Sequence, residues 1–278
     1  MRRSARVRKT AMVTVIGAAT ALAPVVHLGS SARAQERPAP GHTLPDDLVG
    51  PMHGLGLHAE ESGTPPRGLR LRAIAARALD DSIATWKRIM GPRSQEVADV
   101  NLRFVTRLGP SNCFGLYAGE GPAYCSGNRT VFVGTHEANR LMARFGPRGE
   151  AGLTFLIGHE MGHHIQNIHG RFHLLNNVIA RAPAARSYLV RRFELEADCY
   201  AGVWIQASPE WANSARFRSD LIEVLSTMGD DSILGAEGRA PRQGAHGTSR
   251  ERTRWFVRGT NSGGDWSACN LFSSAEMP

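Results

Sequence analysis

The sequence predicts an α+β fold that is mostly helical and contains a small β-sheet. Five stretches place apolar residues at helical spacing, whereas only two short runs have the alternation or the β-branched and aromatic content of strands. With 278 residues, of which 42% are hydrophobic, the chain is long enough to bury a full-sized core. One domain, or one domain with a short appendage, is therefore expected.

Residues 1–34 have the pattern of a secretory signal peptide. A positively charged stretch from Arg2 to Lys9 precedes the apolar residues 11–26 and a small-x-small site at residues 32–34. The alternative is an N-terminal membrane anchor, although an apolar stretch of 16 residues is short for a spanning helix, which needs roughly 20. We expect an exported protein, located in the periplasm, the cell envelope or outside the cell, with membrane contact only if this segment stays uncleaved.

The formal net charge of +8 does not indicate a nucleic-acid partner, because six of the basic residues lie in this segment. Removing those six from the 33 basic residues leaves 27 against 25 acidic residues, a net charge of +2. Residues 35–67 are rich in proline and glycine and show no sustained periodicity, so they are predicted to form a linker or an extended arm.

Residues 68–278 contain the predicted elements of the main domain. Helices are expected over residues 68–90, 149–170, 186–207 and 215–228, and strands over residues 100–106 and 130–133. Thr248 to Glu251 has the spacing of a capping box and predicts a short helix that runs toward Gly259. If residues 130–133 form an edge of the sheet, they could pair with an extended peptide.

The strongest functional signal is His159-Glu160-Met161-Gly162-His163, an HExxH motif inside a predicted helix. Four residues advance a helix by about 400°, so the two imidazoles lie on one face and can share a single ion. We therefore predict one Zn²⁺ ion on His159 and His163. Glu160 is expected to be the base that takes a proton from a water molecule.

A third ligand is expected on another helix, since catalytic zinc normally has three protein ligands and one open position. Glu194 and Asp198 lie four residues apart within the predicted helix 186–207 and therefore share a face. Glu194 is the predicted third ligand. Asp198 is predicted to hydrogen-bond a ligand imidazole and fix its tautomer.

Three segments, residues 158–167, 194–204 and 246–256, resemble the bacterial neutral zinc metallopeptidase family, within a match from about Cys113 to Cys269. The resemblance implies a zincin-like metallopeptidase domain in which Glu194, which begins an ExxAD motif, is the third zinc ligand. The chain departs from the family at Glu196, where Gln is expected, and at Ser126, where Pro is usual.

Two other residues are alternative ligands. Glu196 is a rival to Glu194, but it lies about 200° away around the helix and does not pair with Asp198 at i+4. His164 is a weaker rival, because adjacent helix positions diverge by about 100°.

The four cysteines indicate two disulfides in a chain that is expected to reach an oxidising compartment. Three pairings are possible. Cys113 and Cys125 flank a glycine-rich stretch, which favours a local bridge and leaves Cys199 for Cys269. The family resemblance implies the same two pairs.

The sequence thus predicts an exported zinc metallopeptidase that hydrolyses a peptide or protein substrate. His246, just before the predicted capped helix, is expected to hydrogen-bond the oxyanion of the tetrahedral intermediate, and an ordinary loop histidine is the alternative. The competing hypothesis is an exported, catalytically inactive binding scaffold stabilised by a zinc ion with a closed set of four ligands.

Overall fold

The computed structural model describes residues 67–106, 122–232 and 246–270. The predicted signal peptide and all but the last residue of the predicted linker lie outside these ranges, so both stay predictions. In chain order the elements are α1 (Arg67–Met90), α2 (Ser94–Ala98), β1 (Asn101–Val105), β2 (Ala123–Cys125), β3 (Thr130–Gly134), α3 (Thr135–Phe145), α4 (Gly149–Ile168), α5 (Arg171–Arg181), α6 (Arg186–Ala207), α7 (Ala215–Leu225) and α9 (Ser249–Thr260), with short 3-10 turns at 91–93, 146–148, 183–185 and 266–269. The predicted α+β class is confirmed.

The described sheet has three strands in the order β1-β3-β2. β1 runs parallel to β3 with Asn101 opposite Thr130, and β2 runs antiparallel to β3 with Tyr124 opposite Val131. All five residues of β3 are buried. Residues 130–133 therefore do not meet the condition for pairing with an extended peptide, because strands pair with β3 on both sides. The outer strand nearer the motif helix is β2, which contacts α4.

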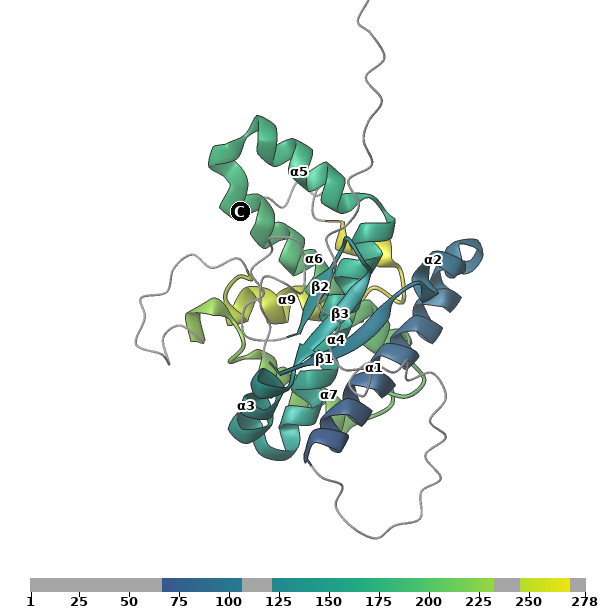
Figure 1. The fold of residues 1–278 in the computed structure, drawn as a ribbon, viewed down its shortest axis with the longest axis vertical. Coiled ribbons are helices and arrows are strands. Elements are labelled where there is room, and N and C mark those ends of the chain that lie inside the picture. The colour runs from purple at the N-terminus through teal and green to yellow at the C-terminus, as the bar shows by residue number, and fades with distance from the viewer. Residues whose placement is uncertain (1–66, 107–121, 233–245, 271–278) are drawn as a thin grey trace, which may run out of the picture. The chain divides into compact units, whose positions relative to one another are not determined.

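Helix α4 lies at the centre of the described domain, where it contacts α1, α3, α6 and α7. Figure 1 shows the sheet lying across α4, with α1 alongside. Sixteen of the 20 residues of α4 are buried, which includes both faces of the helix. A helix enclosed in this way places polar side chains away from water, so each polar group on it needs a partner.

Helices α4, α6 and α9 approach one another closely because glycines line their contacts. A Cβ atom on Gly162 would lie 2.8 Å from the carbonyl oxygen of Ala197 in α6, and one on Gly202 would overlap the carbonyl oxygen of Phe256 in α9. Neither position has room for a side chain. The small residue inside the HExxH motif thus sets how near α6 comes to the two histidines.

Most predicted elements are found close to their predicted bounds. Helix α6 has the predicted bounds, α4 ends two residues early and α7 three. Gly170 follows α4 with a φ of 69°, the left-handed conformation that glycine favours. The capping box at the start of α9 is confirmed: the Thr248 hydroxyl accepts from the Glu251 amide while the Glu251 carboxylate accepts from Thr248.

Four elements are not anticipated: α2, β2, α3 and α5. Helix α5 has a readable pattern, since Phe172, Leu175 and Ile179 recur at helical spacing between Gly170 and Pro183. Strand β2 has only three residues, too few to show alternation. Among the described residues, no helix combines the length and the apolar character needed to cross a membrane.

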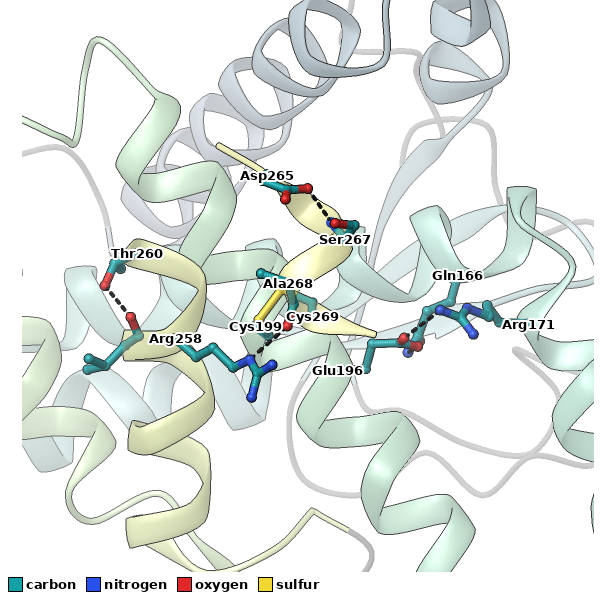
Figure 2. The surroundings of a disulfide bond; sticks show 11 residues. Gln166, Arg171, Glu196, Cys199, Arg258, Thr260, Asp265, Ser267, Ala268 and Cys269 are labelled. Atoms are coloured by element: carbon teal, nitrogen blue, oxygen red, sulfur yellow. Dashed lines mark hydrogen bonds and ion pairs between the residues drawn. A yellow bond between two sulfur atoms is a disulfide. The ribbon is translucent and has the colours of Figure 1, made fainter. Parts of the chain in front are cut away.

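A disulfide joins Cys199 in α6 to Cys269 in the turn Trp266–Cys269 (Figure 2). This is the longer-range of the two pairs expected from the sequence. Cys113 lies outside the described residues, so its pairing with Cys125 stays a prediction.

Candidate metal centre

Three potential ligand atoms converge where α4 faces α6. One carboxylate oxygen of Glu194 lies 3.1 Å from Nε2 of His159 and 3.3 Å from Nε2 of His163. All three atoms lie within 4.8 Å of one another. Two atoms that bind one zinc ion at about 2.05 Å with tetrahedral angles are separated by about 3.3 Å. The geometry of this group therefore fits a zinc ion.

The tautomer of His159 is fixed by Asp198 and Arg252. Nδ1 of His159 lies 2.8 Å from Oδ1 of Asp198. Arg252 donates from Nη2 to the same oxygen at 2.8 Å and from Nε to Oδ2 at 3.0 Å. A carboxylate held by two guanidinium hydrogen bonds is an acceptor, so Nδ1 of His159 carries a proton and Nε2 is the nitrogen left to bind a metal ion.

Gln166 fixes the tautomer of His163, as Asp198 does for His159. Its Nδ1 lies 2.7 Å from Oε1 of Gln166, one helical turn further along α4. The ring also stacks on Phe193 at a centroid distance of 5.4 Å, which limits its rotation. Each histidine therefore directs Nε2 toward Glu194, and its Nδ1 is bound away from the group.

Burial and neighbouring charges shift the pKa values of these groups in the metal-free protein. Burial alone would lower the pKa of His159, but the carboxylates of Asp198 and Glu194 raise it to about 10. Burial likewise opposes ionisation of Glu194, yet His163 and His159 hold its pKa well below the usual value. A metal ion that binds here must displace protons from imidazole nitrogens, as ligand deprotonation requires.

Glu160 lies beside the group and is only 6% exposed. Burial raises its pKa, while the nearby imidazoles of His159 and His163 lower it in part. A carboxylate in such a site is a stronger proton acceptor than one in water. The position and the environment of Glu160 are therefore those that a catalytic base requires.

His246 lies at the entrance of the site, with its side chain half exposed. Its Nε2 is 3.9 Å from the Glu194 carboxylate, and its Nδ1 is 3.5 Å from Oδ1 of Asp230. The backbone amides of His246 and Gly247 both donate to Oδ2 of Asp230, at 2.9 and 3.0 Å. Asp230 thus fixes the backbone at His246 and Gly247, and its contact with Nδ1 leaves Nε2 of His246 directed toward the group.

The two alternative ligands point elsewhere. His164 is fully buried, with Nδ1 2.9 Å from the Tyr124 hydroxyl and Nε2 3.1 Å from the carbonyl oxygen of Glu96. Glu196 is also fully buried, and its carboxylate contacts Gln166 and Arg171. Neither residue belongs to the group of ligand atoms around Glu194.

A cavity of about 390 Å³ opens next to the group. His159, Glu160 and His246 are among the residues that line it, together with the apolar side chains of Leu141 and Leu156 and the charged side chains of Arg140 and Arg144. The cavity therefore gives a ligand access to Glu160 and to the histidines.

A family model described as "Putative neutral zinc metallopeptidase" matches residues 58–272. The chain belongs to this family. The neutral zinc metallopeptidase family implies that zinc is the ion for the group of His159, His163 and Glu194, and it suggests a hydrolase.

Relatives of this member of the neutral zinc metallopeptidase family are known by sequence. Uncharacterized protein YpfJ of Escherichia coli (strain K12) is 29% identical over 240 residues, which cover 82% of each chain. Uncharacterized protein Rv2575 of Mycobacterium tuberculosis (strain ATCC 25618 / H37Rv) is 31% identical over 175 residues, 56% of this chain and 57% of the relative. No solved structure matches the chain.

Three polar residues of the site have no role predicted from the sequence: Gln166, Asp230 and Arg252. Gln166 could have been found, because it follows His163 by three residues and must share its helix face. Asp230 and Arg252 come from segments whose contact with α4 and α6 depends on the tertiary fold, and neither lies in a recognisable spacing with the motif.

Proposed function

We propose that the protein is an exported zinc-dependent metallopeptidase that hydrolyses peptide bonds. One observation carries this proposal: the two imidazoles of an HExxH helix and a carboxylate from a second helix converge at distances that fit zinc, next to the buried carboxylate of Glu160. Family membership supports the same reaction class. The site residues are assigned on this basis, with His159, His163 and Glu194 as metal ligands.

When zinc is bound it supplies Lewis acidity, which makes a water molecule more acidic and a peptide carbonyl more electrophilic. Glu160 accepts the proton of the attacking water and later donates it to the leaving amine. His246 hydrogen-bonds the oxyanion through Nε2, and Asp230 holds the ring in position for this contact. Asp198 and Gln166 keep the two ligand imidazoles in the tautomer with a free Nε2 lone pair.

The cavity suggests how a substrate is oriented. Leu141 and Leu156 line the cavity together with His159 and Glu160, and an apolar side chain next to the scissile bond could pack against these two leucines. Such burial contributes about 1.5–3 kcal/mol for a residue of the size of Leu or Phe. We therefore propose peptides with an apolar residue at this position as substrates.

The decisive experiment compares zinc content and peptide hydrolysis for the wild type, Glu160→Gln and Glu194→Ala. Glu160→Gln should retain zinc and lose hydrolysis by about 100-fold or more, because it removes only the base. Glu194→Ala should lose both zinc and hydrolysis. Glu150→Gln is the matched control, because it makes the same change in the first turn of α4, where Glu150 pairs with Arg70 away from the group.

Undiminished hydrolysis by Glu160→Gln would contradict the assignment of the base. A wild type that holds zinc but cleaves no member of a mixed peptide library would instead favour the binding scaffold. Export is tested separately by the mass of the protein recovered from the envelope or the medium, which should begin near Gln35.

A further inference from the structure

A buried row of polar side chains continues inward from His163, behind the proposed metal site. Beyond Gln166 the next member is Glu196, whose Oε2 accepts a hydrogen bond from Nε2 of Gln166 at 2.9 Å. The other oxygen of Glu196 forms an ion pair with Nη2 of Arg171 at 2.9 Å. Figure 2 shows Gln166, Glu196 and Arg171 together, close to the Cys199–Cys269 disulfide.

The contacts allow only one orientation of the Gln166 amide. Its Nε2 lies 2.8 Å from the carbonyl oxygen of Phe193 and 2.9 Å from Oε2 of Glu196, and both of these atoms are acceptors. The NH₂ group must therefore face Phe193 and Glu196, which leaves Oε1 facing His163. An oxygen at 2.7 Å requires a proton on Nδ1 of His163, and the lone pair is then on Nε2.

Arg171 holds Glu196 in the position that this orientation needs. Glu196 is completely buried, and a buried carboxylate is expensive unless it is paired. Arg171 also donates to Oδ1 of Asn270 at 3.0 Å, and Asn270 directly follows the disulfide-bonded Cys269. The guanidinium is thus fixed between α6 and the segment that the disulfide attaches to α6.

We propose that Glu196 and Arg171 are positioning residues for His163: acting through Gln166, they determine which imidazole nitrogen offers a lone pair to the metal. The proposal rests on the zinc site proposed above and adds two residues that do not touch the ion. It also gives a role to the glutamate at the position where the family resemblance leads one to expect glutamine. Gln166 and Arg171 approach different oxygens of Glu196, so a glutamine in the same position would turn its donating NH₂ group toward one of these two donors.

The test is a double-mutant cycle on zinc affinity, measured by competition with a chelator and therefore independent of activity. Glu196→Gln keeps the shape of the side chain and should weaken zinc binding by about tenfold, the lower end for residues that support metal ligands. Gln166→Leu should weaken it at least as much. In the Gln166→Leu background, Glu196→Gln should have no further effect, because the connection to His163 is already broken.

Asp81→Asn is the matched control. Asp81 accepts a hydrogen bond from Trp204 of the same helix α6, so this variant also changes a carboxylate to an amide at an α6 contact, but not one connected to His163. Its zinc affinity should equal that of the wild type. Arg171→Gln provides a second route to the same effect if Glu196→Gln does not fold, and the folding of each metal-free variant is checked by circular dichroism.

A second readout is the ¹⁵N spectrum of the zinc-loaded protein, in which Nδ1 of His163 should be protonated in the wild type and heterogeneous in Glu196→Gln. Unchanged zinc affinity in both Glu196→Gln and Arg171→Gln would overturn the proposal. It would also be overturned if Glu196→Gln weakened zinc binding equally in the wild-type and the Gln166→Leu backgrounds. A wild type that binds no zinc would instead overturn the proposed function, and this inference with it.

Discussion

At the scale of single residues, Arg252 balances the negative charge of the site. It is 4% exposed, donates two hydrogen bonds to Asp198 and donates a third from Nη1 to the carbonyl oxygen of Met228 at 3.0 Å. Burial would raise the pKa of Asp198, but Arg252 and His159 lower it below the usual value. Without Arg252, the buried carboxylate of Asp198 would have His159 as its main remaining partner.

Removal of the Arg252 guanidinium should therefore destabilise the folded protein. Arg252→Met should lower the free energy of unfolding by about 3–5 kcal/mol, the usual effect of breaking a buried ion pair. Arg252→Lys should cost less but still weaken zinc binding, because an ammonium group cannot replace the two parallel hydrogen bonds. Urea unfolding of the metal-free protein and zinc titration measure the two effects.

Arg148→Lys is the control for both variants. Arg148 forms an exposed ion pair with Glu223, and such a pair contributes at most about 1 kcal/mol. If Arg252→Met lowered the free energy of unfolding as little as Arg148→Lys does, the role given to Arg252 would be contradicted.

Tyr124 gives a pH dependence that can be assigned to one group. Burial is the main reason that its pKa rises to about 12, while the hydrogen bond from Asn167 lowers it slightly. Below pH 10 the phenol is neutral in the folded and the unfolded chain, so Tyr124 adds no pH dependence there. Between pH 10 and 12 the unfolded chain loses the proton first, and the free energy of unfolding should fall by about 2 kcal/mol.

The measurement compares the wild type with Tyr124→Phe. Tyrosinate absorbance of the folded protein should differ between them by one group that titrates near pH 12. Urea unfolding at several alkaline pH values should show a shallower decline for the variant. A Tyr124 that ionises near pH 10 would contradict the prediction.

At the scale of elements, the distance between α4 and α6 determines whether the three proposed ligands can meet. Gly162 lies against α6, because a Cβ atom at this position would be 2.8 Å from the carbonyl oxygen of Ala197 and 3.0 Å from its Cα. Glu194 lies three residues before Ala197 on α6. A change in helix separation at Ala197 is therefore transmitted directly to the Glu194 carboxylate.

Gly162→Ala should separate the two helices and lower the free energy of unfolding by about 1–3 kcal/mol, the usual effect of overpacking. Zinc affinity should fall as well, although no ligand is changed. Gly68→Ala is the control, since a Cβ at this helical position in α1 meets nothing within 4 Å and should be neutral or slightly stabilising. Normal zinc affinity in Gly162→Ala would show that the site tolerates a wider helix separation.

The regular spacing of residues along a helix explains which parts of the site can be predicted from the sequence. The i, i+4 spacing places His159 with His163 and Glu194 with Asp198 on shared faces, and the structure brings these two faces together. The sequence could not show that β3 has a strand on each side, because pairing joins segments far apart in the chain. For the same reason it could not show that Arg252 approaches Asp198 across 54 positions.

At the scale of the whole molecule, the Cys199–Cys269 disulfide attaches the end of the described chain to the helix that carries Glu194. It closes a segment with a sequence separation of 70 residues. Loss of such a crosslink should lower the free energy of unfolding by about 4 kcal/mol through the larger entropy of the unfolded chain. Urea unfolding of the double variant Cys199→Ala, Cys269→Ala and of the wild type measures this difference.

The same variant should also bind zinc more weakly if Asn270 helps to hold Arg171. Asn270→Ala is the control that removes this hydrogen bond and leaves the disulfide intact. A doubly replaced protein that is as stable as the wild type would contradict the prediction.

The two histidines are close in sequence, whereas Glu194 is 31 positions beyond His163 and reaches it only after α6 has packed on α4. An unfolded chain therefore offers the ion two donors, and only the folded chain offers three. If the proposed export passes the chain through a translocation channel in an extended form, the chain would arrive without its metal. Such a protein would have to acquire zinc after transport, so the supply of the ion in the destination compartment would control how much working protein accumulates.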